Sequence, residues 1–261
     1  MIKTIGSIGK TELQTASSLF DTLTFAVRVF LNFFDHRTYN SASRMVFIQQ
    51  LYVTSVQILP LFLFVAVIFG FLFNVMAFQM VKDSALADSL RRLLMGFVVT
   101  ELSPFMTVLL IALRSSSAIN AEMAVMKVNG EMNTLERFRI DSIHYLFIPR
   151  IISGMFSMIF LNSLFAFVSV SIGLFISSPF FGTSVDIYID TLLQSTSLLD
   201  IFIMLVKCAI FGFFITLIPI HVGLNASQEQ NDIPCAILDG MVNVFIAIVT
   251  IEVLLSIVRF I

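Results

Sequence analysis

Three ionisable side chains, Glu101, Lys207 and Glu252, stand inside long apolar stretches of the chain. If these stretches cross a membrane, each charge costs about 2.5 to 3.5 kcal/mol at mid-depth on insertion scales, so such residues are functional candidates by default. Counted from the expected outer ends of their helices at 1.5 Å per residue, all three lie about 9 to 14 Å inward. Opposite charges at one depth can stabilise each other, and an ammonium group can also bind a lipid phosphate.

Two interpretations of these charges stay open at this point. Each side chain could snorkel to the outer interface or make a packing hydrogen bond. Alternatively, Glu101 and Glu252 flank Lys207 in a polar cluster that lines an outward-facing lipid cavity and contacts a headgroup. Asp239 stands near the expected cytoplasmic start of the last span, where a boundary residue or a helix N-terminal charge is the simpler interpretation.

The composition requires a membrane. Hydrophobic residues make up 58% of the 261 residues and charged residues only 12%, and the mean hydropathy is +0.98. A soluble domain of this length could not bury so much apolar surface. No Asp, Glu, Lys or Arg occurs between Val46 and Val81, and Pro60 and the glutamines ahead of it mark the approach to the first span.

The apolar runs predict an all-α integral membrane protein with five transmembrane helices. The expected spans are residues 58–80, 93–113, 151–178, 201–220 and 234–258. We expect residues 1–57 to form an N-terminal part with an interfacial helix, residues 58–261 to form a five-span domain, and residues 114–150 to form a loop outside the membrane on the side of the N-terminus.

Residues 19–34 predict an interfacial amphipathic helix ahead of the first span. Apolar and polar side chains separate onto two faces at helical spacing. The apolar face holds Leu19, Leu23, Val27, Phe30 and Phe34, and the polar face holds Asp21, Thr24, Arg28, Asn32 and Asp35.

The basic residues orient the spans. Ten of them fall on one side, at Lys3, Lys10, Arg28, Arg37, Arg44, Arg114, Lys127, Arg137, Arg139 and Arg150, and four on the other, at Lys82, Arg91, Arg92 and Arg259. The positive-inside rule therefore predicts a cytoplasmic N-terminus and a C-terminus on the outer side.

Several other chemistries find no support in the sequence. The segment Gly6 to Thr11 resembles a phosphate-binding loop, but Thr4 stands where the first glycine belongs and no apolar strand precedes it. Any ATP hydrolysis must therefore come from another chain. No hydrolase motif occurs, the two cysteines have no metal or redox spacing, and the scattered bases exclude nucleic acid as a partner. No cofactor is expected.

The loop 114–150 has an unusual mixture of apolar and charged residues. Met123, Met126, Leu135 and Phe138 alternate with charged side chains, which suits a short helix that docks on a partner protein. A solvated loop fits the composition equally well.

Residues 101–152, ELSPFMTVLLIALRSSSAINAEMAVMKVNGEMNTLERFRIDSIHYLFIPRII, resemble the signature region of the MlaE (YrbE) permease family. That family forms the membrane subunit of ABC transporters that move lipids alongside MCE-domain proteins. The matching positions are Glu101, Leu102, Pro104, Arg114, Ala118, Ile119, Ala121, Glu122, Met126, Lys127, Val128, Leu135, Asp141, Tyr145, Leu146, Pro149 and Arg150.

The resemblance implies a transporter subunit that is not an enzyme and has no ATPase site of its own, located in the cell inner membrane as a multi-pass protein with a cytoplasmic N-terminus and a periplasmic C-terminus. Its implied partners are a cytoplasmic ABC ATPase, a periplasmic MCE-domain protein, phospholipid and a second copy of the permease. Members of this family typically have an acidic residue at the position of Glu101, a lysine in the fourth span and an acidic residue in the fifth. The resemblance therefore favours the interpretation of Glu101, Lys207 and Glu252 as a charge cluster in a lipid cavity. The implied ATPase-coupling residues are Glu122, Met126, Lys127, Glu131 and Leu135.

Two other classes of membrane protein are alternatives to an ABC transporter permease. An ion-coupled secondary transporter of a hydrophobic substrate would need inverted repeats and broken helices near the midplane, and five spans do not divide into halves. An intramembrane lipid-modifying enzyme would need a His/Asp or Ser/His pair in or near a span, which the sequence does not show.

Overall fold

The computed structural model describes residue 22 and residues 24–33, 41–82, 87–181, 185–226 and 233–260, and every regular element in these ranges is a helix. Five helical runs are long and apolar enough to cross a membrane, which confirms the predicted fold class. They cover Ser43–Gln79, Arg92–Val128, Ile143–Ser177, Leu198–Asn225 and Ile233–Ile257.

The first three runs contain several elements each. The first consists of α2 (Ser41–Leu51), the π-helix η2 (Tyr52–Val56) and α3 (Leu59–Lys82). The second consists of α4 (Ala87–Phe97), η3 (Val98–Leu102), α5 (Ser103–Ile111), η4 (Ala112–Ser116) and α6 (Ser117–Val128). The third joins η5 (Ile143–Phe147) to α8 (Ile148–Phe181).

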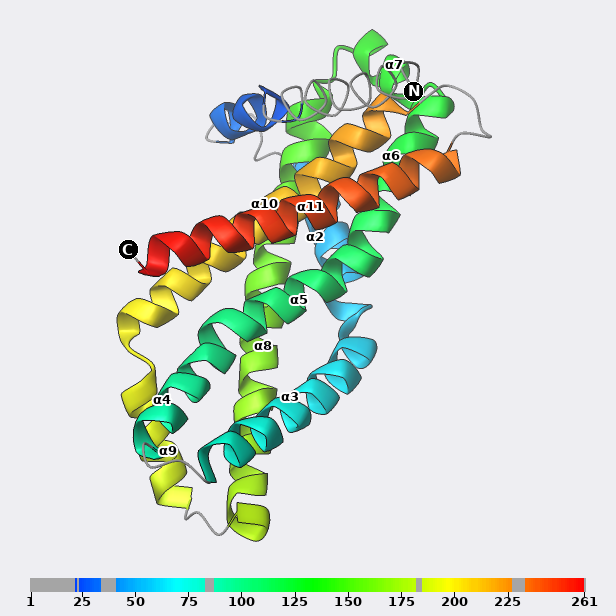
Figure 1. Ribbon diagram of the computed structural model, residues 1–261. Helices are drawn as coiled ribbons and strands as arrows, with labels where there is room; N and C mark the ends of the chain where they lie inside the picture. Colours follow the sequence, from blue (N-terminus) through cyan, green and yellow to red (C-terminus); the bar gives the residue numbers. More distant parts are fainter. Residues whose placement is uncertain are drawn as a thin grey trace, which may run out of the picture.

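The remaining elements are two long helices, α10 (Leu198–Asn225) and α11 (Ile233–Phe260), and two short ones, α7 (Glu131–Arg137) and α9 (Val185–Ser195). The helix α7 and the N-terminal helix of residues 24–32 lie at one end of the molecule, and α4 and α9 lie at the opposite end (Figure 1). One end of the molecule therefore carries α7, and the other end carries α4 and α9.

The first run begins earlier than the predicted start of the span at residue 58. Helix is present from Ser41, and the predicted boundary coincides with a turn between η2 and α3. At 1.5 Å per residue the run Ser43–Gln79 measures about 55 Å, against roughly 30 Å of hydrocarbon. Part of this helix must therefore extend beyond the bilayer.

The predicted amphipathic segment is helical over residues 24–32. Val27 and Phe30, assigned to its apolar face, are exposed, as an interfacial helix requires, while Ala26 and Val29 are buried against the helix core. Leu19, Asp21, Leu23, Phe34 and Asp35 lie outside the described residues.

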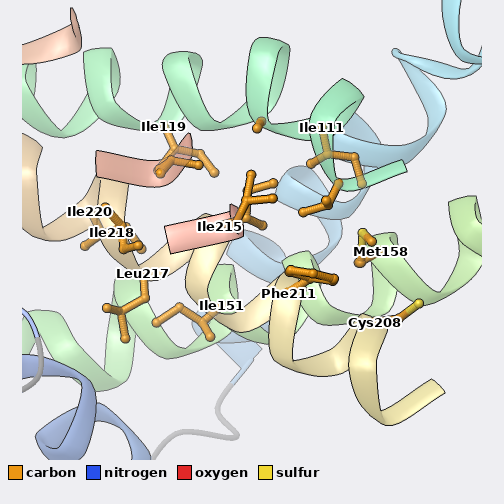
Figure 2. Close-up of a cluster of buried hydrophobic side chains, with 14 of the residues drawn as sticks. Ile111, Ile119, Ile151, Met158, Cys208, Phe211, Ile215, Leu217, Ile218 and Ile220 are labelled. Atoms are coloured by element: carbon orange, nitrogen blue, oxygen red, sulfur yellow. The ribbon is translucent and has the colours of Figure 1, made fainter. Parts of the chain in front are cut away.

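The core forms around one face of α10. Cys208, Phe211 and Ile215 recur at helical spacing and are essentially inaccessible, and they pack between α8 on one side and α5 and α6 on the other (Figure 2). Ile151 and Met158 of α8 complete the contact. This stripe anchors α10 in the centre of the bundle.

A glycine pair allows α8 and α10 to cross closely. A Cβ added at Gly212 would lie 2.6 Å from the Cα of Met155 and 2.8 Å from the carbonyl oxygen of Gly154. Small residues at a crossing let two backbones approach each other, a common device between helices in membranes. Hydrogen bonds add to the contact elsewhere in the bundle, for example from Ser55 to Ser157 at 2.8 Å.

Candidate functional site

The three charges predicted at one depth meet in the structure. The Nζ atom of Lys207 on α10 donates to Oε2 of Glu101 on η3 at 2.5 Å and to Oε1 of Glu252 on α11 at 2.8 Å. The exposed fractions of the side chains are 4% for Lys207, 12% for Glu101 and 19% for Glu252. We call these three residues the ion cluster.

The position of Glu101 depends on a local change in the helix. Pro104 has no backbone N–H and therefore cannot donate to the carbonyl oxygen of the residue four positions earlier. Just ahead of it the chain forms the π-helix η3, in which the N–H of Ser103 reaches back to the oxygen of Val98. Such π-turns rotate the residues they contain relative to an α-helix and occur frequently at functional sites.

Hydrogen bonds on both sides of Glu101 hold this turn in place. The hydroxyl of Thr100 donates to the oxygen of Gly96 at 2.9 Å. The hydroxyl of Ser103 donates to Oδ1 of Asn162 on α8 at 2.7 Å. The backbone that carries Glu101 is thus fixed both along its own helix and against α8.

The start of α10 fixes the depth of Lys207. Ser197 and Asp200 form a reciprocal capping box, in which each side chain bonds to the backbone N–H of the other residue. Lys207 then lies in the third turn of the helix. The cap therefore fixes how far the ammonium group lies from the N-terminal end of α10.

The ion cluster carries more negative than positive groups. If both carboxyl groups are ionised, its net charge is −1, and Oε2 of Glu252 is buried with no hydrogen-bond partner among the described residues. The ammonium group is the least exposed of the three charges. A headgroup phosphate would have to compete with two carboxylates for it, and the contact of the cluster with lipid stays a prediction.

The predicted coupling helix is divided in two. Residues 122 to 135 are not one continuous helix, because Gly130 adopts a left-handed conformation with φ of 71° between α6 and α7. Glu122, Met126 and Lys127 belong to α6, and Glu131 and Leu135 belong to α7. The sequence prediction of a helical segment holds, but the glycine turns its second half in another direction.

Glu122 has a partner within the chain. Its Oε1 accepts from Nη2 of Arg150 on α8 at 2.5 Å, and Nη1 of Arg150 lies 3.9 Å from the sulfur of Met123. Arg150 is buried, whereas the Glu122 side chain is half exposed. The sequence motif contains both residues but gives no signal that they pair.

The α7 segment presents its side chains outward. Glu131, Thr134 and Glu136 are exposed, Leu135 is half-buried, and Phe138, just after the helix, is 73% exposed. An aromatic ring so exposed beside charged groups is typical of a protein-binding surface. The sequence pattern of the loop 114–150 includes Phe138 as an apolar residue, but Phe138 is not one of the predicted coupling residues.

The described residues contain no group of three or more His, Cys, Asp or Glu side chains that could hold a metal ion. Cys208 and Cys235 are both free thiols. The ion cluster brings three charged side chains together inside the described bundle, and we treat it as the candidate functional site.

Five membrane-length helices around a buried ion cluster define a polytopic membrane protein with a polar group in its interior. A family model described as Permease MlaE matches residues 47–258. The chain belongs to the MlaE permease family, which confirms the resemblance found in the sequence.

Individual relatives agree with this family. A probable ABC transporter permease protein of Synechocystis is 35% identical over 127 residues, so the match spans about half of each chain, at 49% and 48%. The intermembrane phospholipid transport system permease protein MlaE of Haemophilus influenzae is 24% identical over 214 residues, 82% of each chain. The chloroplastic protein TRIGALACTOSYLDIACYLGLYCEROL 1 of Arabidopsis thaliana is 28% identical over 151 residues, 56% of this chain and 43% of that relative.

Removal of the ammonium group alone should destabilise the bundle. Lys207→Met leaves two carboxylates facing each other without compensation, and breaking a buried ion pair in this way typically costs about 3 to 5 kcal/mol. The combined variant Glu101→Gln, Lys207→Met, Glu252→Gln, which has no charge at the site, should recover most of that loss. Unfolding of the purified proteins in one detergent measures both values. Equal stability of the single and the combined variants would show that the three charges do not interact.

Proposed function

We propose that this chain is the permease subunit of an ABC transporter that moves phospholipid, or a related lipid, between the inner membrane and an MCE-domain partner. A separate cytoplasmic ATPase drives the movement. The observation that carries the proposal is the ion cluster, which three helices build at one level inside a permease of the MlaE family.

The proposed substrate follows from the chemistry of the site and from the relatives. A zwitterionic or anionic headgroup needs a polar contact inside the membrane, and the ion cluster offers both signs of charge there. A relative that matches 82% of the chain is a phospholipid transport permease by name. A rival role as an ion-coupled transporter predicts transport without ATP.

The proposed ATPase contact is the surface formed by α6 and α7. The helix α7 lies at the end of the molecule opposite to α4 and α9 (Figure 1), and the exposed Phe138 follows it directly in the chain. Its charged groups, Glu131, Glu136 and Arg137, can pair with a partner around an apolar centre.

The proposed orientation and assembly complete the account. The excess of Lys and Arg on the side of α7 supports a cytoplasmic position for the N-terminus and this surface, and a periplasmic position for the C-terminus. One chain has one such surface. A transporter with two ATPase subunits therefore needs two copies of the permease, and we propose a homodimer.

The function is tested by reconstitution. The permease, coexpressed with a candidate ATPase and a candidate MCE-domain protein from the same organism, is placed in vesicles of defined phospholipids with one labelled species. We expect lipid to move between the vesicles and the MCE-domain protein only when ATP is hydrolysed. Transport without ATP but dependent on an ion gradient would replace this function by the rival one.

The docking surface makes a separate prediction. Leu135→Arg and Phe138→Arg should each weaken ATPase association by about fivefold or more, because truncating or charging the centre of a packed interface typically costs over 1 kcal/mol. Leu193→Arg is the matched control, since Leu193 is an exposed leucine on α9 at the opposite end. Copurification of tagged ATPase measures the association. An ATPase lost with Leu193→Arg and retained with the two loop variants would reverse the proposed orientation.

A further inference from the structure

A fully buried amide joins α6 to α11 at the end of the bundle near α7. Nδ2 of Asn120 donates to the backbone oxygens of Ala236 at 2.9 Å and of Ile237 at 3.4 Å, both in the first turns of α11. These oxygens also serve the hydrogen bonds of α11 itself, so the amide clamps one helix onto the backbone of another.

Two glycines provide the space for this clamp. A Cβ added at Gly240 would collide with Nδ2 of Asn120, and a Cβ added at Gly223 would lie 2.6 Å from Cβ of Met123 and 2.8 Å from the oxygen of Asn120. The backbones of α6, α10 and α11 thus approach one another most closely around a single side chain. We call Asn120, Gly223 and Gly240 the three-helix junction.

The junction connects two places that the proposed function needs to link. On one side, α6 leads through Gly130 to α7. On the other side, the same three helical runs carry Glu101, Lys207 and Glu252, about 18 to 28 Å along each helix. A displacement of α6 at the cytoplasmic end is therefore passed directly to the helices that form the ion cluster.

The clamp is incompletely satisfied in this structure. Oδ1 of Asn120 is buried and has no hydrogen-bond partner among the described residues. A buried acceptor without a partner is unfavourable, and an element that is only partly satisfied in one arrangement is suited to change to another. The amide is thus well placed to hold one state of the bundle without locking it permanently.

We propose that Asn120 is a positioning residue that couples ATP hydrolysis to lipid movement. Its amide holds α6 on the start of α11 in the present state, and it releases the two carbonyl oxygens when the ATPase moves α7 and α6. The ion cluster then opens because its three helices no longer move as one unit. This inference rests on the proposed function.

The test separates the hydrogen bond from the packing. Asn120→Asp keeps the shape of the side chain but turns oxygens toward the two carbonyl oxygens, and Gly240→Ala pushes the amide away. Both variants should hydrolyse ATP while the lipid moved per ATP falls about fivefold or more, the lower range of measured coupling between sites. The combined variant Asn120→Ala, Gly240→Ala has no collision, because the amide is gone, but it also lacks the hydrogen bond. It should therefore fold stably and still move less lipid per ATP.

Asn74→Asp is the matched control. Asn74 is also a buried amide that bonds to the backbone of another helix, at 3.0 Å from the oxygen of Ser169 on α8, but it is remote in sequence from α6 and α7. It should lower thermal stability and leave the lipid moved per ATP unchanged.

The outcomes distinguish the inference from the function. Wild-type lipid moved per ATP in the combined variant would overturn the role of the amide and leave the transporter function intact. If the wild-type complex moves no lipid on ATP hydrolysis, the proposed function fails and the coupling role fails with it.

Discussion

The charge of Lys207 is the constraint on which the bundle depends. An ammonium group in hydrocarbon has to be compensated by groups of the opposite sign, and here both of them come from other helices. The second, fourth and fifth spans must therefore meet at one level and at fixed rotation. The capping box at Ser197 sets the level of the ammonium group, and the π-helix before Pro104 sets the rotation of Glu101.

The opposite end of the same three helices is held by a different kind of contact. Around Asn120, glycines and one amide join α6, α10 and α11, and among the described residues the ion pair nearest to this contact, Glu122 with Arg150, links α6 to α8 instead. A contact of this kind can separate at lower cost than the buried charges. Between the two ends, α8 and α10 cross in close contact at Gly154 and Gly212. This arrangement is consistent with a bundle whose helices separate first around Asn120 and then at the ion cluster.

Much of this architecture could be predicted because lipid restricts the sequence strongly. Apolar runs located all five spans, and the constant rise of a helix placed the three charges at one depth. Counting along the helix gives depth but not rotation, so the contribution of the π-helix was invisible. The division at Gly130 was missed because glycine is tolerated within helices, and the pair of Glu122 with Arg150 depends on where α8 passes. The role of Asn120 could not be predicted, because a single asparagine in a helical sequence looks the same whether its side chain is buried or exposed.

The most direct test of the central claim is a reversal of charges in the ion cluster. Glu101→Lys and Lys207→Glu should each abolish ATP-driven lipid transport, because each places like charges together in the bundle. The double variant restores the net charge and the opposite-charge pair between positions 101 and 207, although position 207 then carries the same charge as Glu252, so it should regain part of the transport lost in either single variant. Transport in the double variant no better than in the worse single variant, or undiminished transport in both single variants, would contradict the account.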